Sequence, residues 1–161
     1  MIEIKLIESE DFQTIINWNL GKDEEYLNQW AGNKVYSYPL TIDQFANRTV
    51  DDSTQIFKIL EDNRMIGSIE LSDINKETGT AKVCRFIMDE DSSGQGNGQK
   101  ALMALVDYAF NELYLSYLVL RVFSYNIRAI RCYEKVGFSI EHENENYENP
   151  KWNSFTMSIH R

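Results

Sequence analysis

A stretch rich in glycine, Gly94-Gln95-Gly96-Asn97-Gly98, separates a predicted strand at 81–88 from a predicted apolar helix. The backbone N–H groups of such a loop, together with the positive end of the helix dipole, favour a bound phosphate group. Two nucleotide-binding patterns do not match. The loop continues as Gln99-Lys100-Ala101, without the Gly-Lys-Ser/Thr of a P-loop, and its glycines are spaced G-x-G-x-G rather than G-x-G-x-x-G. A plain surface turn is the alternative for this loop taken alone.

A second constellation follows further along the chain, directly after an apolar strand predicted at 118–123. Asn126 opens the pattern N-x-x-A-x-x-x-Y-E-K-x-G-F, which runs to Phe138. Asn126 has the residue type of a helix N-cap, and Gly137 is the residue type that commonly ends a helix. Tyr133 lies within this helix, where a tyrosine either packs into the core or offers its phenol as a proton donor.

The two constellations together resemble motifs A and B of the Gcn5-related N-acetyltransferase (GNAT) superfamily, whose coenzyme loop reads R/Q-x-x-G-x-G/A. The resemblance covers residues 81–138, and a hairpin predicted at 56–71 fits the strands that precede motif A. It implies one GNAT domain over residues 1–161 of the α/β (α+β) class, with a single mixed, mostly antiparallel central sheet flanked by helices. It also implies an enzyme, an acetyl-CoA-dependent N-acetyltransferase and hence an acyltransferase.

The resemblance assigns the coenzyme site to three segments. The pantetheine arm pairs with the backbone of residues 86–88, where an N–H near Met88 polarises the thioester carbonyl. The glycine loop holds the pyrophosphate, Asn126 lies beside the pantetheine arm, and Lys135 offers charge to the adenosine phosphates. The implied coenzyme-binding residues are Phe86, Ile87, Met88, Ser93, Gly94, Gln95, Gly96, Asn97, Gly98, Gln99, Asn126 and Lys135.

Ser93 departs from the superfamily pattern, because Arg or Gln is expected at its position. The backbone amides can still hold a pyrophosphate, but a charge-assisted side-chain contact is lost. Either Gln95, Lys100 or Arg131 compensates, or the coenzyme binds more weakly than usual. The departure also keeps open a second class of function, a non-catalytic acetyl-CoA-binding sensor or interaction domain with the GNAT fold.

The implied reaction is the attack of a neutral amine on a thioester, followed by protonation of the departing thiolate. Tyr133 matches the superfamily tyrosine that acts as the general acid. The pKa of a phenol, ~10, differs little from that of a thiol, ~8.5, so proton transfer between the two groups is nearly balanced. Glu70 is the candidate base or amine anchor, because it lies near the end of a predicted strand. Asp73, Glu24 and Glu25 are alternatives, and each of these carboxylates has a solvated surface position as its simpler interpretation.

Charge and subgroup resemblance bear on the acceptor. The 161 residues carry 16 Lys+Arg and 25 Asp+Glu, a net charge of −9, which disfavours a nucleic-acid partner and favours a cationic one. The segment Ile66-Gly67-Ser68-Ile69-Glu70-Leu71 resembles bacterial polyamine and ribosomal-protein N-terminal acetyltransferases. We therefore expect as acceptor a small cationic amine (polyamine-like) or a protein N-terminus. The resemblance is also compatible with a homodimer.

The remaining expectations concern metals and compartment. Cys84 and Cys132 lack metal-ligand spacing, and His142 and His160 are too separated for a metal site, so we expect no metal. Two unpaired cysteines are typical of a reducing cytoplasm. The first six residues lack the apolar core of a signal peptide, and no apolar run approaches the ~20 residues of a membrane span. We expect a cytoplasmic protein without a membrane partner.

Hydropathy patterning supplies the elements that must position these residues. It predicts a strand at 2–6, a helix after 9–11 and two weak helices within 21–50 that are joined by an aromatic loop. A hairpin at 56–71 follows, then a polar turn at 72–80 and the strand at 81–88. After the glycine-loop helix and the strand at 118–123, a helix is predicted at 127–136. Two last strands, at 138–140 and 154–159, flank an acidic stretch at 141–148.

Overall fold

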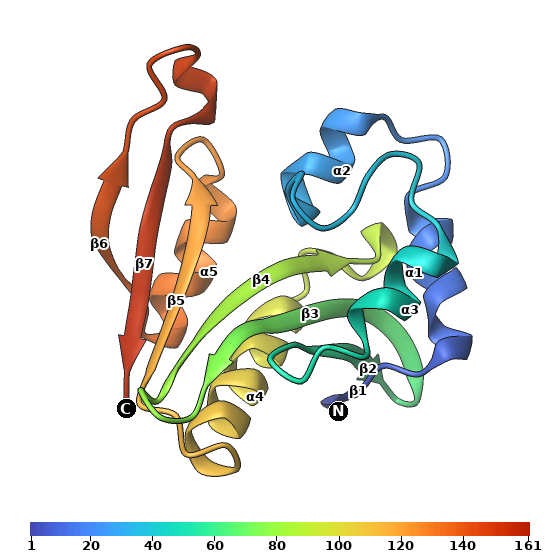
Figure 1. The fold of residues 1–161 in the computed structure, drawn as a ribbon, viewed down its shortest axis with the longest axis horizontal. Helices are drawn as coiled ribbons and strands as arrows, with labels where there is room; N and C mark the ends of the chain where they lie inside the picture. Colours follow the sequence, from blue (N-terminus) through green and yellow to red (C-terminus); the bar gives the residue numbers. More distant parts are fainter.

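Seven strands form one sheet in the computed structural model, which describes all of residues 1–161 (Figure 1). Their order across the sheet is β1-β2-β3-β4-β5-β7-β6, and every neighbouring pair is antiparallel except β4 and β5. This confirms the predicted mixed, mostly antiparallel sheet. The strands are β1 (Ile2–Leu6), β2 (Gln55–Glu61), β3 (Arg64–Asn75), β4 (Thr80–Met88), β5 (Tyr117–Phe123), β6 (Ser139–Asn144) and β7 (Ser154–His160).

Two helical layers cover the sheet, one on each face (Figure 1). The helices are α1 (Phe12–Trp18), α2 (Glu24–Ala31), α3 (Ile42–Arg48), α4 (Asn97–Asn111) and α5 (Ile127–Val136), with short 3-10 turns η1 (Ser9–Asp11), η2 (Glu90–Ser92) and η3 (Pro150–Trp152). The predicted helices within 21–50 and at 127–136 are confirmed. No helix combines the length and the apolar character that crossing a membrane would require.

The larger core lies between the sheet and α4. Leu102, Leu105 and Ala109 recur at helical spacing on α4 and are fully buried against Ile69 and Leu118 of the sheet. A smaller core joins α1, α2 and α3 through apolar and aromatic side chains: Phe12, Ile15, Leu27, Ala31, Tyr36, Leu40 and Phe45. The helices on the second face are therefore held together by a hydrophobic core of their own.

β4 and β5 pair only at one end and then diverge, which divides the sheet into two parts. Their parallel pairing covers only Thr80–Lys82 of β4 against Tyr117–Val119 of β5. Beyond it the sheet opens into two arms (Figure 1): β1 to β4 with α1–α3 form one, and β5, β7 and β6 form the other. We call these the β1–β4 arm and the β5–β7 arm.

Two predicted boundaries were wrong for one reason. The predicted turn at 72–80 begins too early, because β3 continues to Asn75, with Leu71 and Ser72 paired to Val83 and Lys82. The acidic stretch at 141–148 was expected to separate two strands, yet residues 141–144 belong to β6. Edge strands and strand ends expose both faces to solvent, so polar residues there carry no alternation that marks a strand.

Candidate functional site

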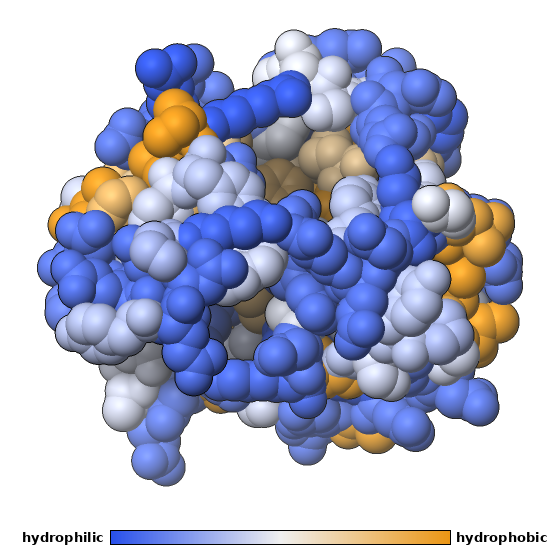
Figure 2. Space-filling model, turned by 90° about the horizontal axis from the view of Figure 1, so that it is seen from above, coloured by the Kyte–Doolittle hydropathy of each residue, from blue (hydrophilic) through white to orange (hydrophobic).

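The opening between the two arms leaves one edge of β4 without a partner strand. No residue of β5 pairs with Val83–Met88, so the backbone groups on that edge are available to an extended ligand, which could add there like a further strand. Seen from above, the surface is hollowed between the arms, with apolar residues at the floor and a mostly hydrophilic rim (Figure 2). Phe86, Ile87 and Met88, the predicted pantetheine contacts, all lie on this segment of β4.

A β-bulge shapes the same segment. Glu70 pairs with Cys84 and Ser68 pairs with Ile87, so Arg85 and Phe86 together oppose Ile69 alone. Arg85 takes a positive φ of 50°, which is uncommon for a residue with a side chain. Bulges increase twist and re-aim side chains. Here the bulge lies where β4 separates from β5.

Glu70 is 1% exposed and lies between two arginines. Arg85 Nη1 donates to its Oε1 at 3.1 Å, and Arg48 of α3 donates to the same oxygen. Burial raises the pKa of Glu70, and both guanidinium groups oppose that shift. One carboxylate oxygen thus accepts from two guanidinium groups. The base role of Glu70 stays a prediction, and the two ion pairs also suit a positioning role.

The glycine loop presents uncapped backbone donors. Gly96, at a φ of 77°, is the N-cap of α4, and no side chain caps the first N–H groups of that helix. Gly94 also has a positive φ, and Gly98 leaves room for Phe86, whose Cζ would lie 3.4 Å from a Cβ there. Because a helix N-terminus without a capping side chain needs another acceptor, the loop fits an anionic group.

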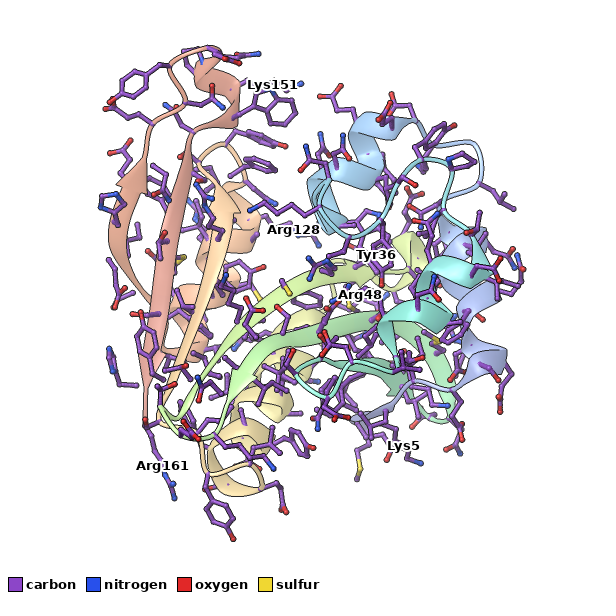
Figure 3. All side chains as sticks on the ribbon, viewed as in Figure 1. Lys5, Tyr36, Arg48, Arg128, Lys151 and Arg161 are labelled. Atoms are coloured by element: carbon purple, nitrogen blue, oxygen red, sulfur yellow. The ribbon has the colours of Figure 1, made fainter.

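Arg128 is a site residue that sequence reasoning missed. A Cβ at Gly94 would lie only 2.8 Å from Arg128 Nη2, so the guanidinium lies directly against the glycine loop. Figure 3 shows Arg128 extending from α5 toward the opening between the arms. It is exposed, whereas Ser93 in the loop offers only a hydroxyl. Its place in the first turn of α5, two residues after Asn126, was the available signal.

The other predicted coenzyme residues are distributed along the loop and α5. Asn97 is 5% exposed, and its Nδ2 has no hydrogen-bond partner. Asn126 caps α5, accepting from the Ala129 N–H at 3.2 Å. Lys135 lies in the last turn of α5, about 10 Å along the axis from Arg128 at the usual rise per residue. Arg128 therefore lies at the glycine loop, and the predicted contact of Lys135 with the adenosine phosphates stays a prediction.

Tyr133 is half-buried on α5, next to both cysteines of the chain. Its ring lies 6.0 Å from that of Phe138, and no group in the chain hydrogen-bonds its hydroxyl. Burial raises the pKa of Tyr133, and the nearby Cys132 and Cys84 thiols raise it further. The phenol is therefore protonated at neutral pH. Because Cys84 belongs to β4, Tyr133 lies where α5 approaches the free edge of β4.

Comparisons with known proteins agree on one family. A family model described as an acetyltransferase (GNAT) domain matches residues 4–159. Spermidine N(1)-acetyltransferase of Escherichia coli is 27% identical over 142 residues, covering 88% of this chain and 75% of the enzyme. Acetyltransferase PseH of Campylobacter jejuni is 25% identical over 141 residues, covering 88% and 85%. Among solved structures, the spermidine N-acetyltransferase of Vibrio cholerae in complex with CoA and spermine superposes with a TM-score of 0.82 at 22% identity, covering 99% and 95%.

Proposed function

The chain belongs to the GNAT acetyltransferase family and is an acetyl-CoA-dependent N-acetyltransferase, and from this premise we propose that its acceptor is a primary amine of a di- or polyamine. The observation that carries the site assignment is the free edge of β4 beside an uncapped glycine loop. The acceptor class is supported by the similarity to a spermidine acetyltransferase and by the net charge of −9.

We propose that the coenzyme's phosphates lie on the glycine loop, held by the backbone N–H groups at 94–98 and by the Arg128 guanidinium. Arg128 then supplies the charge-assisted contact that Ser93 cannot make. The pantetheine arm would add to the free edge of β4 at Phe86–Met88, with its acyl end near Met88. When bound, the coenzyme supplies an acetyl group activated as a thioester.

Tyr133 is the proposed general acid. Its raised pKa keeps the phenol protonated, and burial also raises the pKa of a thiol formed beside it. The pKa values of the phenol and the thiol are thus both raised, so they stay close to each other, as efficient proton transfer requires. Asn126 supports this role indirectly, because it caps the helix that carries Tyr133.

For Glu70 we propose a positioning role in place of the predicted base. Its carboxylate joins Arg85 at the bulge of β4 to Arg48 at the end of α3. Figure 3 shows Arg48 beside Tyr36, with the guanidinium carbon 5.6 Å from the ring centroid. The ion pairs connect the coenzyme-binding edge to the helical layer, and we propose that this layer contributes the acceptor side.

The alternative of a non-catalytic sensor was based on Ser93. The Arg128 guanidinium lies against the glycine loop and can make the contact that Ser93 cannot, so Ser93 no longer argues for a sensor.

The predicted homodimer stays a prediction. The Vibrio cholerae relative has been solved as a dodecamer, and we propose that this chain also self-associates.

A thiol-release assay with acetyl-CoA tests the acceptor class. Spermidine, spermine, putrescine, an aminoglycoside and peptides with free N-termini are compared at equal concentration. We expect kcat/KM to be highest for spermidine or spermine. A peptide that exceeds every polyamine would instead establish the protein N-terminus as the acceptor.

A further inference from the structure

We propose that the ammonium group of Lys151 occupies a cation site built for a distal ammonium group of the acceptor, which displaces it on binding; this inference rests on the proposed polyamine acceptor. The site consists of the acidic first turn of α2 on one arm and an aromatic cluster on the other arm. We call it the bridging site and define it by Glu25, Lys151, Trp152 and Tyr125.

The bridging site spans the opening between the arms. Glu25 belongs to the first turn of α2, and Lys151 belongs to η3 at the tip of the hairpin formed by β6 and β7. The Lys151 Nζ donates to the Glu25 carboxylate across 126 positions of sequence. In Figure 3 Lys151 reaches from the tip of the β5–β7 arm toward α2. An acceptor entering between the arms from this end passes the pair.

Aromatic rings complete the site on the β5–β7 arm. The Nζ of Lys151 lies 4.8 Å from the centroid of the Trp152 ring, within the range of a cation–π interaction. Phe123 packs edge-on against Trp152 at 5.2 Å and stacks on Tyr125 at 5.6 Å. Three rings at the end of β5 and η3 thus pack together, and the Trp152 ring is the one that lies beside the Lys151 ammonium group.

Negative charge on α2 exceeds what Lys151 neutralises. Asp23 is the N-cap of α2, and Glu24 and Glu25 belong to its first turn. The pKa of Lys151 is raised first by its hydrogen bond to Glu25, with contributions from Tyr125 and Asp23. One ammonium group therefore lies near two carboxylates, those of Glu25 and Asp23, and beside the Trp152 ring. A polyamine, which carries several ammonium groups, matches this balance better than a single lysine does.

The contact between Lys151 and Glu25 is easily exchanged. The two side chains are 49% and 44% exposed, and ion pairs with such exposure contribute little to stability. The lysine side chain ends in a primary alkylammonium group, which is also the terminal group of a polyamine. When the polyamine ammonium group replaces that of Lys151, the contacts to Glu25 and Trp152 are kept, and only the molecule that carries the positive charge changes.

Steady-state kinetics on the full-length protein test the inference with spermidine and with propylamine, which has a single amine. We expect Lys151→Gln to lower the KM for spermidine about two- to fivefold, the range that exposed ion pairs are worth. We expect Glu25→Gln and Trp152→Leu to raise it by at least as much. In all three variants the KM values for propylamine and acetyl-CoA stay at the wild-type level.

Matched controls come from the exposed pair Lys5–Glu3 on β1, whose atoms are 3.8 Å apart. Lys5→Gln and Glu3→Gln make the same changes of net charge as Lys151→Gln and Glu25→Gln, and they should leave the KM for spermidine unchanged. The inference is overturned if the bridging-site variants keep the wild-type KM for spermidine, or if the controls shift it equally. A wild-type protein that acetylates propylamine but no polyamine overturns the proposed acceptor, and this inference with it.

Discussion

Arg85 donates to Glu70 across a β-bulge, with Nη1 3.1 Å from Oε1, and this contact fixes the part of β4 that faces the opening between the arms. Because Arg85 has a positive φ, its backbone conformation needs support from surrounding contacts. Glu70 provides one from β3, and Arg48 links the same carboxylate to α3. A single buried acid therefore joins the coenzyme edge to the helical layer.

Replacing this acid should destabilise the fold. Glu70→Gln leaves two arginines without their anion in a buried position, and breaking a buried ion pair typically costs about 3–5 kcal/mol. Urea unfolding of wild type and variant at neutral pH measures the difference. A base role predicts the opposite pattern: a variant of normal stability whose kcat is reduced and whose pH profile loses one limb.

Arg128 should determine coenzyme affinity. Arg128→Gln removes a guanidinium from the glycine loop, and we expect the KM for acetyl-CoA to rise about 10- to 100-fold, the usual value of hydrogen bonds to a charged partner. Arg131→Gln, on an exposed position of the same helix, is the matched control and should change this KM little. If Arg131→Gln has the larger effect, the assignment of Arg128 is wrong.

Gly94 and Arg128 should be energetically coupled. At Gly94, with a φ of 85°, an alanine is strained, and its Cβ would displace Arg128 Nη2. We expect Gly94→Ala to raise the KM for acetyl-CoA in the wild-type background. In the Arg128→Gln background its effect should be smaller, because the displaced group is already gone. Fully additive effects in this double-mutant cycle would show that the two residues act independently.

Tyr133 should make stability depend on pH at the alkaline end. Its pKa is raised in the folded state, so folding holds the proton more tightly than the unfolded chain does. The stabilisation is complete below the ordinary tyrosine pKa of ~10 and is lost as the pH rises above it. Urea unfolding at a series of alkaline pH values should show a steeper loss for wild type than for Tyr133→Phe. Parallel curves would contradict the raised pKa.

How far the site could be predicted depended on how local its determinants are. The loop at 94–98, Asn126 and Tyr133 each belong to a contiguous motif. In the structure Gly98 lies against Phe86 and Tyr133 lies near Cys84, both on the free part of β4, while Asn126 caps α5. The ion pairs of Glu70 depend on a bulge at Arg85 and on the packing of α3 over the sheet. Hydropathy patterning contains no information on either feature, so Glu70 looked like a free carboxylate.

Contacts between distant segments were equally hidden. Arg128 meets Gly94, and Lys151 meets Glu25, only because the β5–β7 arm stands opposite the β1–β4 arm. The net charge of −9 indicated a cationic acceptor, but the net charge does not say which acidic residues lie at the opening between the arms. Asp73 pairs with Lys82 at the closed end of the sheet, whereas Glu25 lies at the opening.

Acetyl transfer from the coenzyme to a polyamine at the β4 edge can be followed in a single reaction that detects both products. Wild type and Tyr133→Phe are incubated with acetyl-CoA and spermidine, while thiol release is followed and the amine product is identified by mass. We predict monoacetylated spermidine in step with thiol release for wild type. For Tyr133→Phe we predict a kcat lower by roughly 10²–10⁴-fold with the KM for acetyl-CoA unchanged. Thiol release without acetylated spermidine, or equal kcat values for the two proteins, would contradict the account.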